Sequence, residues 1–208
     1  MSDTEPCTVV EHFLQLVAPH RKVLSVALDP GNRPPHLHRR LRVYYGADKE
    51  QTQLFWQQLD GAIAAWQADN SLLILFAAGT KSIGRKEVST RLQEKGVPFR
   101  FYHGDSNENT RFRDLADPGT WWAQLGAVVA TTVLGRGVDL PGPNDTPPLN
   151  VNSVFVAMDR SGCDFGDLFQ FMLRARHVQN ATIEVLLVGT MAGSASTSGD
   201  RQAGWHCG

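Results

Sequence analysis

One uninterrupted apolar segment, Leu72–Ala78, constrains the fold of this chain more than any other feature. Side chains of an extended strand alternate between its two faces, and here both faces are entirely apolar. Such a strand must be buried on both faces, as strands are in parallel sheets covered by helices. Seven residues are far fewer than the roughly 20 that a membrane-spanning helix needs. The segment therefore predicts the interior strand of a parallel sheet.

Strand-like and helix-like segments alternate after residue 70. Apolar strands are predicted at 72–77, 97–102, 127–131, 153–158 and 182–188, and helices at 82–95, 108–116 and 164–174. Such alternation is typical of an α/β domain whose parallel sheet carries helices on both faces, and we place this domain at 71–189. Residues 190–208, rich in Gly, Ser and Thr, predict a disordered tail.

Residues 1–70 are predicted to be an N-terminal α/β extension. They contain strand-like segments at 23–28 and 41–45 and a helix at 50–68, in which Leu54, Phe55, Leu59, Ile63 and Trp66 recur at helical spacing. The segment 23–28 is also compatible with the end of a preceding domain.

The overall charge is close to neutral, but it is unevenly distributed. The net charge of −1 excludes a strongly basic nucleic-acid coat protein. Residues 20–45 nevertheless hold six Lys or Arg against one acid, and residues 81–113 hold eight against four. Local positive blocks of this kind can face phosphates while the whole chain stays neutral. The alternative interpretation is a solvated surface.

The cysteines and the N-terminus indicate an intracellular protein without a metal centre. Cys7, Cys163 and Cys207 are scattered and have no zinc-ligand spacing. The chain begins with acidic residues and lacks a secretory signal or a membrane segment. We expect an intracellular location, the nucleus in a eukaryotic cell, and no metal site.

The segment Gly79-Thr80-Lys81-Ser82 only superficially resembles a phosphate-binding P-loop. A P-loop has two glycines five positions apart, with Lys and Ser or Thr directly after the second. Here Thr80 separates Gly79 from Lys81, and Ile74 stands where the first glycine is required. No other stretch fits better, and no run of adjacent acids is suited to magnesium. The chain can supply only part of a nucleoside triphosphate site.

Three other segments carry the functional prediction. They are Tyr102–Asp105 followed by Arg111, Val129–Asp139, and Gln170–Arg176. Each ends a predicted strand or lies on a helix at one edge of the sheet, the edge at which open α/β sheets bind ligands. Each segment taken alone is compatible with a purely structural role, but their joint order and spacing are not.

The residue types in these segments suit a phosphorylated ligand. Thr131 and Thr132 can offer hydroxyls and amides to a phosphate, and Asp139 can accept hydrogen bonds from a ribose or pair with an arginine. Arg174 and Arg176 are suited to stabilising charge on a transferring phosphoryl group.

Together the segments resemble the C-terminal RecA-like domain of superfamily 2 helicases. Residues 72–80 resemble motif IV, His103-Gly104-Asp105 with Arg111 resembles the HGD…R segment, 130–139 resembles motif V, and 170–176 resembles motif VI. In motif VI, Leu173 replaces the usual glycine, His177 replaces the second arginine, and Arg176 comes one place early. This Q-x-x-x-R-x-R form is most similar to the replication-origin-binding helicases of herpesviruses and their eukaryotic relatives.

The resemblance implies a role for each matching residue. Arg174 or Arg176 would be the catalytic arginine finger, and Gly137, Asp139 and Gln170 would contact ATP. Nucleic acid, DNA more than RNA, would be bound by Thr80, Lys81, Gly104, Thr131 and Thr132. ATP with magnesium would be shared with a first RecA-like domain, in cis or in trans, that carries the P-loop.

Two alternatives remain open. The chain is compatible with a truncated relative or non-catalytic RecA-like module that binds nucleic acid without hydrolysing ATP. An unrelated α/β nucleotide enzyme is the third interpretation.

The missing P-loop generates the first testable prediction. The purified 208-residue chain should release no phosphate from ATP above background, with or without nucleic acid. An arginine finger and a ribose contact cannot replace the phosphate cradle and the magnesium carboxylates. A phosphate-release assay checks this, and robust turnover that disappears in Arg174→Ala would contradict it.

Overall fold

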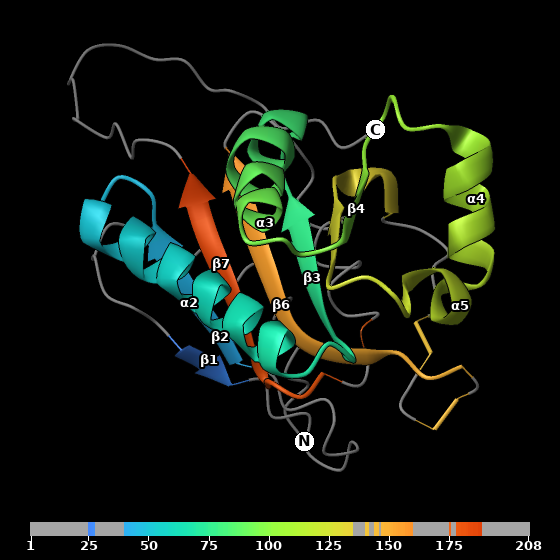
Figure 1. Cartoon of the computed structure of the whole chain (residues 1–208). Helices are drawn as coiled ribbons and strands as arrows, with labels where there is room; N and C mark the ends of the chain where they lie inside the picture. The colour runs from blue at the N-terminus through green and yellow to red at the C-terminus, as the bar shows by residue number, and fades with distance from the viewer. Residues whose placement is uncertain are drawn as a thin grey trace, which may run out of the picture.

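Seven strands form one sheet in a computed structural model that describes residues 25–27, 40–134, 140–141, 144–145, 147–159, 175 and 178–188. The strand order is β1-β2-β7-β6-β3-β5-β4 (Figure 1). The strands are β1 (Ser25–Ala27), β2 (Arg40–Tyr45), β3 (Leu72–Ala78), β4 (Phe99–Tyr102), β5 (Ala127–Ala130), β6 (Asn150–Asp159) and β7 (Thr182–Val188). All neighbouring pairs are parallel except β1–β2. The predicted parallel α/β fold is confirmed.

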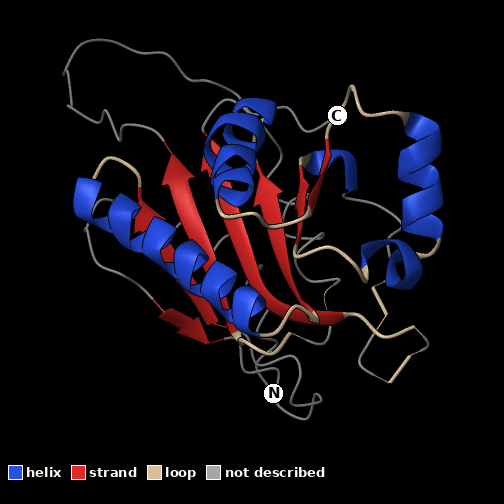
Figure 2. Cartoon of the chain, in the orientation of Figure 1, coloured by secondary structure: helices blue, strands red, loops and turns tan. Residues whose placement is uncertain are grey.

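Helices lie in the described connections between β2 and β3, β3 and β4, and β4 and β5, and directly after β5. They are α2 (Lys49–Ala68), η2 (Ile83–Ser89), α3 (Thr90–Glu94), α4 (Glu108–Ala116), α5 (Pro118–Trp122) and the short η3 (Thr132–Leu134). Figure 2 shows α2 and α3 lying side by side across one face of the sheet, while α4 and α5 stand beyond its β4 edge. Among the described residues, no helix combines the length and apolar character that a bilayer-spanning segment requires.

The core lies on both faces of the sheet because β3 is buried along its whole length. Leu73, Leu75 and Ala77 point to one face and pack with Trp122 of α5. Ile74, Phe76 and Ala78 point to the opposite face, where α2 and η2 cover them. This alternation follows from the two-residue period of a strand, and it places an apolar cluster on each face of the sheet.

Part of the predicted N-terminal extension belongs to the same sheet as the rest of the chain. β2 pairs in parallel with β7 over Arg40–Tyr45, and α2 packs on the shared core through Phe55, Leu59 and Ile63. Within the described residues, elements on the two sides of residue 70 thus share one sheet and one apolar cluster. Sequence order cannot reveal this, because β2 and β7 are about 140 residues apart and meet only through sheet pairing.

The helix predicted over 82–95 has two parts. Its first part, η2, is a π-helix, and α3 continues it. The Ser89 hydroxyl donates to the Gly84 carbonyl at 2.7 Å, five residues earlier. Gly84 lies so close to the Phe101 ring that an added Cβ would be 2.5 Å from Cζ of that ring. Tight packing at Gly84 and side-chain bonding to the backbone together accompany the wider helical turn.

Several predicted segments lie outside the described residues. These are the helix at 164–174, the tail at 190–208 and most of residues 1–39.

An aromatic cluster centred on Phe55 generates a stability prediction. The Phe55 ring lies 5.0–6.2 Å from the rings of Tyr44, Trp56, Phe76 and Phe155 and is fully buried. Replacing Phe55 by Ala should lower the free energy of unfolding by about 3–5 kcal/mol, because it leaves a cavity in a close-packed core. Urea unfolding followed by circular dichroism measures this.

Leu54 provides the matched control. The sequence pattern grouped it with Phe55, but its side chain is 45% exposed. Leu54→Ala should change the free energy of unfolding by less than about 0.5 kcal/mol. Equal losses for the two variants would contradict the packing described above.

Candidate nucleic-acid interface

Three predicted nucleic-acid-binding segments meet at the carboxyl edge of the sheet. Thr80 and Lys81 follow β3, Gly104 follows β4, and Thr131 and Thr132 follow β5. These strands are immediate neighbours in the order β3-β5-β4 and run parallel, so their ends lie at the same edge. The sheet thus brings together all five residues that the sequence assigns to nucleic acid.

Close packing at Gly79 fixes the start of the segment after β3. The Gly79 N–H donates to the Ala157 carbonyl of β6 at 2.7 Å. A Cβ at Gly79 would lie 3.1 Å from that carbonyl oxygen, so a larger residue would push β3 and β6 apart. Glycine here serves strand packing rather than a phosphate cradle, in agreement with the rejection of a P-loop.

Thr80 and Lys81 already have partners in the structure. The Thr80 hydroxyl accepts from the Ile83 N–H at 3.2 Å, which leaves its own proton available to a ligand. The Lys81 ammonium forms an ion pair with Asp105 after β4. This pair links the ends of β3 and β4, and Lys81 would have to exchange Asp105 for a phosphate in order to bind nucleic acid.

A compact turn holds Gly104 outward. The Ser106 hydroxyl accepts from the His103 N–H at 2.8 Å, and His103 Nδ1 accepts from the Asp105 N–H at 3.2 Å. Gly104 is exposed, and no heavy atom lies within 4 Å of the position a Cβ would occupy. Its backbone is therefore open to an approaching ligand.

Thr131 and Thr132 leave β5 beside this turn. The Thr131 N–H donates to the Tyr102 carbonyl at 3.0 Å and extends the β4–β5 pairing by one residue. Thr132 then opens η3. Both residues are half-buried, and they follow the strand that lies between β3 and β4.

A buried carboxylate that the sequence did not single out anchors the β4 side of this edge. Asp114 of α4 is fully buried, and it accepts from the Tyr102 hydroxyl at 2.7 Å and from Arg100 at 3.0 Å. Arg113 donates to its other oxygen at 2.8 Å. The Trp122 indole N–H in turn donates to the Tyr102 hydroxyl at 3.0 Å. This network fixes α4 and α5 to β4, the strand that directly precedes His103.

Burial and neighbouring charges shift two pKa values in the turn. The pKa of His103 lies below its ordinary value of 6.5. Burial of the imidazole is the largest cause, and the positive charge of Lys81 is the second. The hydrogen bond and charge of Lys81 lower the pKa of Asp105. A neutral imidazole beside an ionised carboxylate is therefore the normal state of this turn at neutral pH.

The residues assigned to ATP lie outside the described part of the chain. These are Gly137, Asp139, Gln170, Arg174 and Arg176. Arg111 is described, and its guanidinium lies 3.5 Å from Glu108 and 5.4 Å from the Phe112 ring centre, both on α4. In the described residues, no group of three or more His, Cys, Asp or Glu side chains is placed to hold a metal ion.

Comparisons with known proteins find similarity among solved structures alone. No family model matches the sequence, and no curated protein matches it. Among solved structures, the crystal structure of the Pyrococcus furiosus Hef helicase domain is similar, with a TM-score of 0.42 and 14% sequence identity. The match covers 65% of this chain and 26% of that one, so the chain corresponds to about a quarter of that structure's length.

The charges around His103 generate a prediction for NMR titration. The pKa of His103 should lie below 6.5, rise in Lys81→Ala, which removes a repelling cation, and fall further in Asp105→Asn, which removes an attracting anion. Because the folded-state pKa is below the unfolded one, His103 should destabilise the fold only as the pH falls below about 6.5. A wild-type pKa at or above 6.5 would contradict the placement of this imidazole.

Proposed function

We propose that this chain is the second RecA-like half of an ATP-dependent nucleic-acid helicase of superfamily 2, which grips one strand at the carboxyl edge of its sheet. The observation that carries the proposal is the convergence of Thr80–Lys81, Gly104 and Thr131–Thr132 on three adjacent parallel strands. Their order along the chain matches the family's motifs, and their common edge is the one at which open α/β sheets bind ligands.

The chemistry of this edge suits a phosphate backbone. It offers the hydroxyls of Thr131 and Thr132 and the open backbone of Gly104. Arg85 and Lys86 are exposed on η2, directly after the β3 segment. Hydroxyls, backbone amides and cations contact phosphates without reading bases, so binding should have little sequence preference.

The ATP side of the proposal rests on sequence resemblance. Arg174 or Arg176 would act as arginine finger, and Gly137, Asp139 and Gln170 would face ATP, whose magnesium and P-loop belong to a first RecA-like domain in cis or in trans. The form of residues 170–176 supports an origin-binding role in DNA replication, with DNA preferred over RNA and an intracellular, in eukaryotes nuclear, location.

A non-catalytic RecA-like binding module is the second candidate. It is supported by the sequence, in which no segment fits a P-loop and no run of adjacent acids is suited to magnesium. Photo-crosslinking of ATP to this chain, mixed with a RecA-like domain that carries a P-loop, separates the two candidates. Crosslinking that is lost in Arg174→Ala supports the helicase, and its complete absence supports the module.

Strand binding can be tested by fluorescence anisotropy with a single-stranded oligonucleotide across a series of salt concentrations. Affinity should fall by roughly 0.7 log units per log unit of salt for each phosphate contacted. The triple variant Lys81→Ala, Arg85→Ala, Lys86→Ala should bind more weakly and with a flatter slope. Thr131→Val with Thr132→Val should weaken binding without flattening the slope, because hydroxyl contacts release no counterions.

Thr120→Val, at an exposed position on α5, is the matched control and should bind like the unmutated chain. A salt slope of zero in the unmutated chain would mean that the positive blocks are only solvated surface. Strong preference for one duplex sequence would also count against strand gripping.

A further inference from the structure

A groove runs between α2 and the η2–α3 helix on one face of the sheet, and it adjoins the candidate interface. It consists of two neighbouring cavities of about 580 and 340 Å³ that share Gly46, Thr52 and Trp56 as lining residues. The smaller cavity reaches Thr80 and Ser82 at the end of β3. A ligand gripped at Thr80 therefore has a direct path into the groove.

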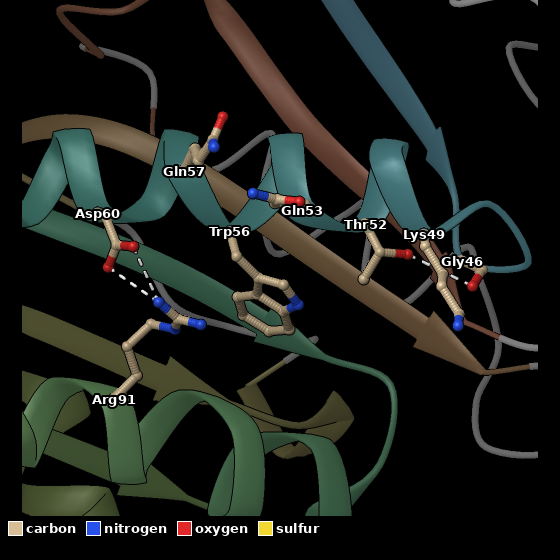
Figure 3. A pocket seen from close by; sticks show the side chains of 8 residues that line it. All are labelled: Gly46, Lys49, Thr52, Gln53, Trp56, Gln57, Asp60 and Arg91. Atoms are coloured by element: carbon tan, nitrogen blue, oxygen red, sulfur yellow. Dashed lines mark hydrogen bonds and ion pairs between the residues drawn. The ribbon is translucent and has the colours of Figure 1, made fainter.

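The Trp56 indole forms a fixed planar surface in this groove. Figure 3 shows the ring pointing from α2 toward α3. It lies parallel to the Phe76 ring, with an interplanar angle of 4° and 6.4 Å between centres, and it contacts Phe55 edge-on. These contacts orient the ring from the core side, while its lining of both cavities leaves part of it accessible.

Arg91 lies over the same indole from the opposite helix. Its guanidinium is 5.2 Å from the Trp56 ring centre, and Asp60 holds it at 2.9–3.0 Å (Figure 3). The ion pair crosses the groove and sets its width. A planar cation beside an indole is a combination that binds aromatic rings by stacking and cation–π attraction.

The rim of the larger cavity offers polar groups. Lys49, Gln53 and Gln57 are exposed on consecutive turns of α2. Among the described residues, Lys49 takes part in none of the ion pairs. Its ammonium can meet a phosphate, and the two amides can both donate to and accept from a base edge.

We propose that the groove binds nucleobases of the single strand gripped at Thr80, and that Trp56 is the stacking residue. The inference rests on the proposed strand-binding function and extends it from phosphate contacts to base contacts. The smaller cavity carries the carboxylates of Glu87 and Asp159, which disfavour phosphate but accept hydrogen bonds from base amino groups. The phosphates would therefore follow the Lys49 side, and the bases would face Trp56.

The test compares two 15-nucleotide single strands of equal charge, one of thymidines and one abasic at its central positions. The unmutated chain should bind the thymidine strand about tenfold more tightly, because one stacked base is worth about 1–3 kcal/mol. Trp56→Leu should bring this ratio close to one, and Trp121→Leu, which alters a half-exposed tryptophan on α5, should leave it unchanged.

A second pair of variants guards against a folding defect in Trp56→Leu. Gln57→Glu places a negative charge in the groove, whereas Gln58→Glu places the same charge on the adjacent exposed position outside the groove lining. We expect Gln57→Glu to weaken strand binding about threefold more than Gln58→Glu does, because Gln57 lines the groove and Coulomb repulsion grows as the distance to the bound phosphates shrinks. Circular dichroism checks that each variant is folded.

The possible outcomes separate this inference from the proposed function. Suppose that Trp56→Leu does not affect binding of the thymidine strand and that the two glutamate variants bind it equally. This result would show that the groove does not bind bases, and it would leave the proposed strand binding intact. No binding by the unmutated chain at any salt concentration would overturn both. If thymidine monophosphate competes at the same concentration as the strand, the groove binds free nucleotides rather than the bases of a single strand, and the inference is wrong.

Discussion

The structure depends on the burial of β3 between β6 and β5. All seven residues of Leu72–Ala78 are buried, and from Leu73 onward their side chains alternate between the two apolar clusters of the core. A strand of this kind cannot lie at an edge, because it must be covered on both faces and paired on both sides. Once it is central, the parallel direction of its neighbours places the ends of β3, β5 and β4 at one edge. The candidate interface is therefore a consequence of the core.

Ion pairs and hydrogen bonds then fix the residues at that edge. Asp114 is a fully buried carboxylate shared by Arg100, Arg113 and Tyr102, and it holds α4 and α5 to β4. The Lys81–Asp105 pair joins the segments that follow β3 and β4. A buried carboxylate without such donors would cost several kcal/mol, so this network defines one position for the strand end that leads to Gly104. At Trp56 a partly exposed pair, Arg91 with Asp60, joins α2 and α3 across the groove.

Local periodicity predicted the elements well. The helix at 108–116 and the strand at 182–188 have the predicted bounds, and Ile83, Val88 and Leu92 are buried as expected. Leu54 is more exposed than its place in the helical pattern suggests, and the helix predicted over 82–95 is present but begins with a π-helical part. Both differences have local packing reasons. An apolar residue at the margin of a helix face can point to solvent, and Gly84 against Phe101 accompanies a π-helical turn that no pattern of apolar residues encodes.

By itself, the sequence determined the α/β class, the parallel sheet and the five strand-binding candidates, because strand burial and motif spacing are local properties of the chain. Only the tertiary structure decided that β2 and α2 belong to this sheet, that Asp105 pairs with Lys81, and that Trp56 faces Arg91. Those contacts join residues 24 to 142 positions apart. The order of the strands and the packing of the helices set the geometry of these contacts. Neither can be predicted from the spacing of residues along the chain.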